Sequence, residues 1–125
     1  MNQKQFETTV EKLNEYDGID EIYLLNYKGE ILFKSKESVE FNEEESKVLL
    51  KAWKEKEPSI HFMNERYAIL KNDEIQLAAK NFSGNGNIAG SVTKDGDYLL
   101  IHIREDTGLI LLEWSIFVNK VAWDQ

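Results

Sequence analysis

Three apolar runs joined by turn-forming residues occupy the segment from Ile75 to Ile103. The runs cover residues 75–80, 88–93 and 98–103, and glycine with asparagine or aspartate separates them. Apolar runs of this length between such residues are typical of an antiparallel meander. The segment is therefore predicted to form three consecutive strands.

The third run, Tyr98–Ile103, is apolar at almost every position. Alternate side chains of a strand point to opposite faces of its sheet. A strand that is apolar on both faces has to be covered on both faces. We therefore expect this strand to lie inside a covered sheet, with its two faces formed by Leu99, Ile101 and Ile103 and by Tyr98, Leu100 and His102.

The flanking segments supply the cover. Apolar residues at helical spacing predict a helix over residues 2–16, with Phe6, Val10 and Leu13 on its buried face. Asn42 can cap a second helix. Its buried face is predicted to be Val48, Leu49, Ala52 and Trp53. Further strands are predicted over residues 19–26, 31–35, 60–63 and 66–71.

The last predicted helix, from about Gly108 to Trp123, has two apolar arcs instead of one. One arc packs on the sheet, and we expect the first helix to cover the other, so that the two termini lie side by side. The wide arc is Ile110, Leu111, Trp114, Phe117, Val118, Val121 and Ala122. The second arc is Leu109, Leu112, Ile116 and Trp123.

Together these elements predict an α+β fold. Its central antiparallel sheet has six or seven strands, with the N- and C-terminal helices on one face and the further helix on the other. A length of 125 residues suits a single domain spanning residues 1–125.

The composition argues against several classes of function. A net charge of −8 argues against nucleic-acid binding, which depends on clustered lysine and arginine. The chain has no cysteine and no apolar run long enough to cross a bilayer. We therefore expect a protein that does not span a membrane, in a reducing compartment such as the cytoplasm.

Residues able to carry catalysis are scarce. His61 and His102 are the two histidines, and both fall in predicted strands. The glycine-rich segment Ser83–Gly86 precedes a strand and not a helix, so it lacks the dipole that helps phosphate loops bind anions. Asp95-Gly96-Asp97 lacks the other ligands of a calcium loop. We predict no enzymatic activity, no cofactor and no metal site.

Arg66, Lys71 and Lys80 lie on or beside neighbouring predicted strands, in a chain that is otherwise acidic. Three cations in one region of a sheet are either a solvated face or a patch that docks an acidic partner.

Several segments then follow one another in a familiar order. A glycine turn and strand at Gly29–Ser35 precede a helix lead-in at Phe41–Glu44 and a basic strand at Arg66–Lys71. A glycine-rich connection at Asn81–Gly90 and a strand end and turn at Val92–Gly96 come next. The apolar strand Tyr98–Ile103 and a final helix opened by Thr107-Gly108 complete the series. In order, spacing and length the chain resembles the profilins.

This resemblance implies a profilin-like fold and a monomeric protein. It implies binding of monomeric actin, and regulation of filament assembly by occupying the barbed-end face of that monomer. Transferred position by position, it places the actin-binding residues at Arg66, Ala68, Lys71, Lys80, Asp106, Thr107, Gly108 and Leu111.

Many profilins also bind proline-rich segments in an aromatic groove between their terminal helices. Here Leu32 stands where the family usually has tryptophan, so the resemblance transfers only Phe6 and Trp123 to a proline-rich-peptide site. The net charge of −8 argues against phosphoinositide binding, although a local basic patch could attract headgroups. The few aromatics and short loops are similar to the diverged archaeal profilins of the Asgard kind.

The same layered architecture also suits two other uses. One is a roadblock- or longin-like scaffold acting with a small GTPase, which would be expected to dimerise. The other is a PAS-like sensor, which needs an internal cavity. The apolar residues on both faces of the sheet leave little room for such a cavity.

Overall fold

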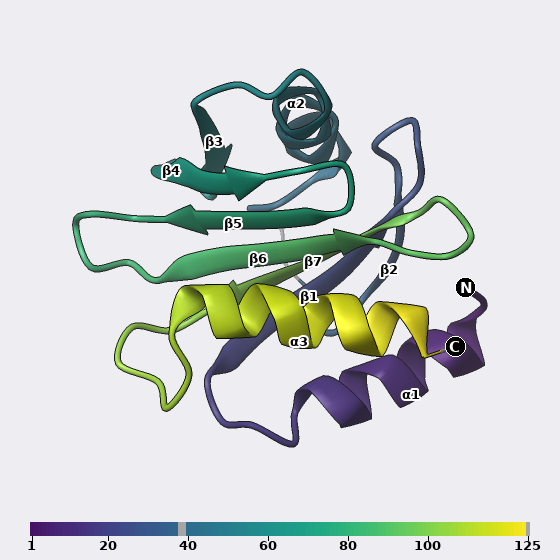
Figure 1. Ribbon diagram of the computed structural model, residues 1–125. Helices are drawn as coiled ribbons and strands as arrows, with labels where there is room; N and C mark the ends of the chain where they lie inside the picture. Colours follow the sequence, from purple (N-terminus) through teal and green to yellow (C-terminus); the bar gives the residue numbers. More distant parts are fainter. Residues whose placement is uncertain (38–39, 125) are drawn as a thin grey trace.

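The computed structural model describes residues 1–37 and 40–124. It contains a seven-stranded sheet in the order β2-β1-β7-β6-β5-β4-β3, and every neighbouring pair is antiparallel (Figure 1). The helices are α1 (Gln3–Leu13), α2 (Glu43–Lys54) and α3 (Leu111–Trp123). The strands are β1 (Ile19–Leu25), β2 (Ile31–Lys34), β3 (Ser59–Phe62), β4 (Glu65–Asn72), β5 (Gln76–Lys80), β6 (Asn87–Val92) and β7 (Tyr98–Ile103). The predicted α+β class and meander are confirmed.

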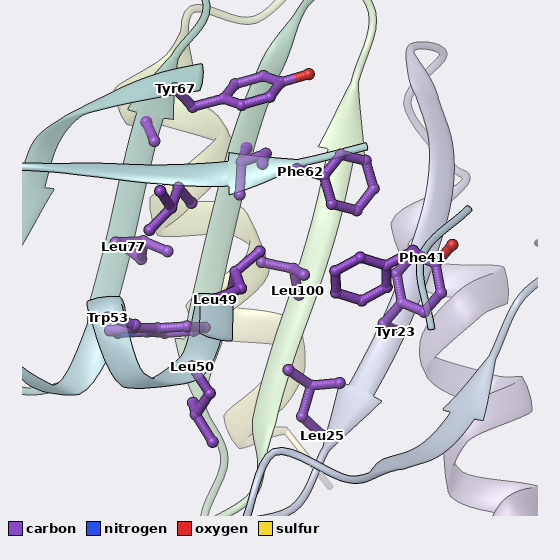
Figure 2. Packing of buried hydrophobic residues seen from close by; sticks show 13 residues of the cluster. Tyr23, Leu25, Phe41, Leu49, Leu50, Trp53, Phe62, Tyr67, Leu77 and Leu100 are labelled. Atoms are coloured by element: carbon purple, nitrogen blue, oxygen red, sulfur yellow. The ribbon is translucent and has the colours of Figure 1, made fainter. Parts of the chain in front are cut away.

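β7 lies between β1 and β6 and is covered on both faces, as predicted. On one face, Leu99, Ile101 and Ile103 pack in a cluster with residues of α1 and α3. On the other face, Leu100 packs with residues of α2, and Figure 2 shows it near Leu49. The sheet therefore separates two apolar clusters, one beneath the terminal helices and one beneath α2.

The termini lie side by side, again as predicted. α1 and α3 run next to each other on one face of the sheet, and α2 lies on the other (Figure 1). Tyr16, just beyond α1, meets the ring of Phe117 in α3 edge-on, with 4.9 Å between centroids.

Side-chain caps fix where two helices begin. The side chain of Asn2 accepts a hydrogen bond from the backbone of Gln5, and Asn42 does the same for Glu45. Both satisfy an otherwise unpaired amide of a first helical turn. α1 ends at Leu13, three residues before the predicted end. Beyond it, Gly18 has a φ of +139°, and an added Cβ there would lie 2.5 Å from Thr107.

The predicted buried face of α2 is partly wrong. Val48 is 61% exposed, whereas Leu50, which was not predicted to be buried, is 2% exposed. The helix turns its Leu49, Leu50 and Trp53 side toward the sheet, and Ser46 lies on the same buried side. Val48 is thereby left on a flank of the helix.

α3 also differs from prediction. It begins at Leu111 and not at Gly108, because the carboxylate of Glu113 accepts a hydrogen bond from the backbone of Ile110 and so caps the first turn there. Most of the second apolar arc is not covered by α1. Tyr16, just beyond α1, contacts Trp114 and Phe117 of the wide arc instead. Leu112, Ile116 and Trp123 are 49%, 57% and 40% exposed.

Candidate protein-binding face

α3 lies over β6 and β5, and the sheet continues past it through β4 to β3 (Figure 1). Among the residues that the structure describes, no helix covers the part of this face beyond α3. Tyr67 and Ile69 of β4 point the other way, into the cluster beneath α2. Arg66 and Ala68 therefore point toward the uncovered side, and the register places Ala68 opposite Lys80 of β5.

A bulge in β4 brings Lys71 to the same face. With strict alternation, Lys71 would share the buried side of Tyr67 and Ile69. The register shifts between Ile69 and Lys71, so that Leu70 is an extra residue. Lys71 then lies opposite Ala78 on the uncovered side, while Asn72 turns inward and donates to the Trp53 carbonyl at 2.8 Å.

Polar contacts hold two of the three cations in place. The ammonium of Lys71 donates to the side-chain oxygen of Gln76 at 2.8 Å, and Ser115 of α3 donates to the same oxygen at 3.1 Å. Lys80 lies 3.8 Å from Glu105. Arg66 is exposed and has no ion pair within residues 1–37 and 40–124. The structure therefore brings the three predicted cations to one side of the sheet.

Exposed apolar side chains border these cations. Ser115 and Asn119 bond to side chains of β5 and β6, which shows that this flank of α3 points away from α1 and toward the uncovered strands. Leu112 and Ile116 lie on that flank, and Leu70 on β4 is 56% exposed. We call this surface the docking face: Arg66, Ala68, Leu70, Lys71, Lys80, Leu112 and Ile116.

The sequence pattern missed the apolar part of the docking face. Leu112 and Ile116 were predicted to be covered by the first helix, and Leu70 was not singled out, although strict strand alternation places it on the same side as Arg66 and Ala68. The second arc of α3 was the available signal, because an arc that no element covers is exposed.

The predicted residues around the start of α3 play different parts. Asp106 and Gly108 are exposed in the loop. The Thr107 hydroxyl accepts a hydrogen bond from the Trp114 indole and donates to the Leu109 carbonyl, both at 2.9 Å. Leu111 is partly buried against the cluster beneath the terminal helices. Thr107 and Leu111 thus make internal contacts.

Both ring nitrogens of His102 have hydrogen-bond partners. Its Nδ1 lies 3.0 Å from Asp20, and its Nε2 lies 3.0 Å from the Tyr67 hydroxyl and 2.9 Å from the Asn85 carbonyl. Burial, together with the nearby carboxylate of Glu65, raises the pKa of Tyr67 to about 12. The tyrosine therefore stays protonated and acts as a structural hydrogen-bonding group.

Phe6 and Trp123, the residues predicted for proline-rich peptides, do not line one groove. Phe6 is 4% exposed and stacks on Phe33, 5.5 Å between centroids, beneath a hollow between α1 and β2. Trp123 donates from its indole to the Val92 carbonyl at 2.8 Å, on the flank of α3 away from α1.

Within the described residues, no helix is both long and apolar enough to span a membrane. The same part of the chain holds no group of three or more histidine, aspartate or glutamate side chains placed to bind a metal ion.

No family model matches this sequence. The chain is 57% identical over 124 residues to Loki profilin-3 of Lokiarchaeum sp. (strain GC14_75), which covers 98% of this chain and 99% of that relative. Among solved structures, LokiProfilin2 in a complex with rabbit actin superposes with a TM-score of 0.79 at 18% identity, over 98% of this chain and 95% of that one. LokiProfilin1 gives a TM-score of 0.73 at 19% identity, over 98% of both chains. Acanthamoeba castellanii profilin IB gives 0.67 at 15% identity, over 84% of this chain and 82% of that one. The structural matches share the fold, and the identity to Loki profilin-3 over nearly the whole length goes further: the chain belongs to the profilin family.

Proposed function

We propose that this profilin binds monomeric actin through the docking face and regulates filament assembly by occupying the barbed-end face of the monomer. In this proposal residues 1–125 act as a single, monomeric binding domain in the cytoplasm, associated with the cytoskeleton and without enzymatic activity. LokiProfilin2 and LokiProfilin1, which share its fold, were solved in complexes with rabbit actin, and this supports the choice of partner. The identity to Loki profilin-3 favours this proposal over the roadblock- or longin-like scaffold.

The observation that carries the proposal is the gathering of Arg66, Lys71 and Lys80 beside exposed apolar side chains, in a chain of net charge −8. Interfaces of stable complexes combine apolar anchors with charges that orient the partner and speed its approach. Leu112 and Ile116 would supply the anchors. The cations would steer an acidic surface of actin onto the face.

The proposed contact set keeps the residues transferred from the family and adds the exposed apolar ones. Arg66, Ala68, Lys71 and Lys80 would contact actin from the strands, with Asp106 and Gly108 contributing from the loop before α3. Thr107 and Leu111 would act chiefly by holding that loop and the start of α3, given their internal contacts.

Reversing single charges tests the proposal. We expect Arg66→Glu or Lys80→Glu to weaken binding of rabbit actin monomers by about five- to tenfold, because each places a repulsive charge in the interface. Lys4→Glu, an exposed position on α1, is the matched control. Affinity is measured by titrating fluorescently labelled actin monomers, and unchanged affinity in both variants would refute the assigned face.

Truncating an apolar side chain tests the anchor. We expect Ile116→Ser to weaken actin binding by about tenfold, as for a central contact residue. Lys120→Ser changes another exposed position of α3 to the same residue and should leave the affinity unchanged. Equal effects of the two variants would show that the flank is not in the interface.

A further inference from the structure

β3 forms one edge of the sheet and lies away from both terminal helices (Figure 1). Its residues alternate in burial, with Ile60 and Phe62 pointing into the cluster beneath α2. An edge strand offers a row of unpaired backbone groups, to which another chain can add as a strand.

The turn after β3 fixes which backbone groups are free. Met63 and Asn64 both have positive φ, 49° and 66°, as in the two-residue turns that close a tight hairpin. Phe62 and Glu65 then form a hydrogen-bonded pair, and such pairs alternate along the ladder. The Ile69 amide donates to the Pro58 carbonyl, so residues 58 and 69 form another of these hydrogen-bonded pairs, as the alternation requires. The amide and carbonyl groups of Ser59 and His61 therefore point away from β4, toward the open edge.

A groove runs along this edge, between β3 and α2. It consists of two hollows of about 370 and 330 Å³, and both are lined by Val48 and His61. Val48 is 61% exposed, and Ala52 beside it is partly exposed. A strand added to the edge would place alternate side chains against this apolar flank of the helix.

The groove is acidic. Its lining includes four carboxylates and one lysine: Glu44, Glu45, Glu55, Glu57 and Lys51. None of the four carboxylates is in an ion pair within the part of the chain that the structure describes. A second copy of this chain, with a net charge of −8, is a poor match for such a surface. A basic segment is a good one.

We propose that the groove between α2 and β3 binds an extended, basic peptide segment of a partner protein as an added strand. The backbone groups of Ser59 and His61 pair with the segment. Val48 and Ala52 receive an apolar side chain, and the glutamates receive flanking lysine or arginine side chains. This site adjoins the docking face proposed for actin, because His61 pairs with Arg66 across β3 and β4, but the two sites share no residue.

The probe is a capped nine-residue peptide with two basic residues at each end and alternating valine and threonine between them. We expect its binding to shift the amide NMR signals of β3 and α2 and to slow hydrogen exchange at Ser59 and His61. Two N-methylated forms, each blocking the amides along one edge of the peptide, separate strand addition from charge attraction. One form should bind and the other should not.

Variants of the protein test the backbone pairing and the charge attraction separately. His61→Pro removes an amide that points away from β4, so the ladder to β4 is kept while binding should be lost. His61→Thr keeps the amide and should bind normally. Glu44→Gln and Glu55→Gln should each weaken binding about two- to fivefold, whereas Glu43→Gln, an exposed position outside the groove, should not.

The proposal is overturned if both N-methylated forms bind equally, or if His61→Pro remains folded and binds like His61→Thr. It is also overturned if sedimentation shows a dimer that His61→Pro abolishes, because a second copy would then occupy the edge. Lys80→Glu should leave peptide binding unchanged, so failure of the actin proposal would not be mistaken for failure of this one.

Discussion

Single polar side chains hold the turns and loops around the docking face. Asp73 is an example: its carboxylate accepts hydrogen bonds from the backbone of Ile75 at 2.8 Å and of Gln76 at 2.6 Å. These bonds join the end of β4 to the start of β5. They also place the side-chain oxygen of Gln76 where it accepts the hydrogen bond from the Lys71 ammonium.

The contribution of Asp73 should depend on pH. Its hydrogen bonds to Gln76 and Ile75 lower the pKa of Asp73 below the ordinary value of 3.8. The carboxylate therefore stabilises the fold above about pH 4, and this stabilisation is lost as the pH falls through the lowered pKa. Urea unfolding should show Asp73→Ala about 1 kcal/mol less stable at pH 6, with a smaller difference at pH 3. A difference that stays constant over this range would contradict the assignment.

Thr107 is predicted to matter for stability. In Thr107→Val the shape is kept, but the Trp114 indole loses its acceptor, and an unpaired buried donor costs about 1–3 kcal/mol. Thr8→Val, at an exposed position on α1, is the control and should change little. The measurement is the free energy of unfolding in urea, and equal stability of the two variants would argue against this role.

At the scale of helices and strands, hydrophobic patterning predicted most of the molecule. Assigning alternate residues of Tyr98–Ile103 to opposite faces of the sheet predicted the two faces of β7 correctly. Both sets of side chains are largely apolar, so exposing either set would leave apolar groups in water. The boundaries of α1 and α3 were less predictable. They depend on local caps such as the Glu113 carboxylate, which the spacing of apolar residues does not reveal.

Tertiary contacts account for the errors within elements. The wheel of α3 shows two apolar arcs but not which neighbour each one meets, so Leu112 and Ile116 were assigned to a contact that α1 makes elsewhere. The cations were predicted to lie together because they fall on or beside neighbouring predicted strands, and the family resemblance placed them together as well. The bulge that puts Lys71 on the same face as Arg66 leaves no mark in the pattern of residues.

The packing of α2 on the sheet predicts the effect of adding one methyl group. A Cβ at Gly90 of β6 would lie 2.6 Å from the Trp53 ring, closer than such contacts allow. We expect Gly90→Ala to reduce the free energy of unfolding by about 1–3 kcal/mol, as overpacking typically does. At Gly108 an added Cβ meets open space, so Gly108→Ala is the control. Equal stabilities in urea would mean that α2 can shift without cost.

At the scale of the whole molecule, the net charge of −8 opposes the local positive charge of the docking face. Exposed charges are screened over about 8 Å at physiological ionic strength. The difference in actin association rate between the wild-type chain and Lys80→Glu should therefore shrink as salt is raised from about 50 to 300 mM. Stopped-flow mixing measures both rates. A difference that does not respond to salt would show that Lys80 acts through packing and not through its charge.

The extra residue in β4 has a consequence for how this strand tolerates changes in length. Leu70 opposes no residue of β5, so the residues before and after it already follow two different phases of alternation. Removing Leu70 would restore a regular alternation of side chains along β4, with Ile69 still facing inward and Lys71 still facing outward. A one-residue deletion within a strand normally exchanges its inner and outer sides. Deleting Leu70 would instead leave the inner and outer sides of β4 unchanged.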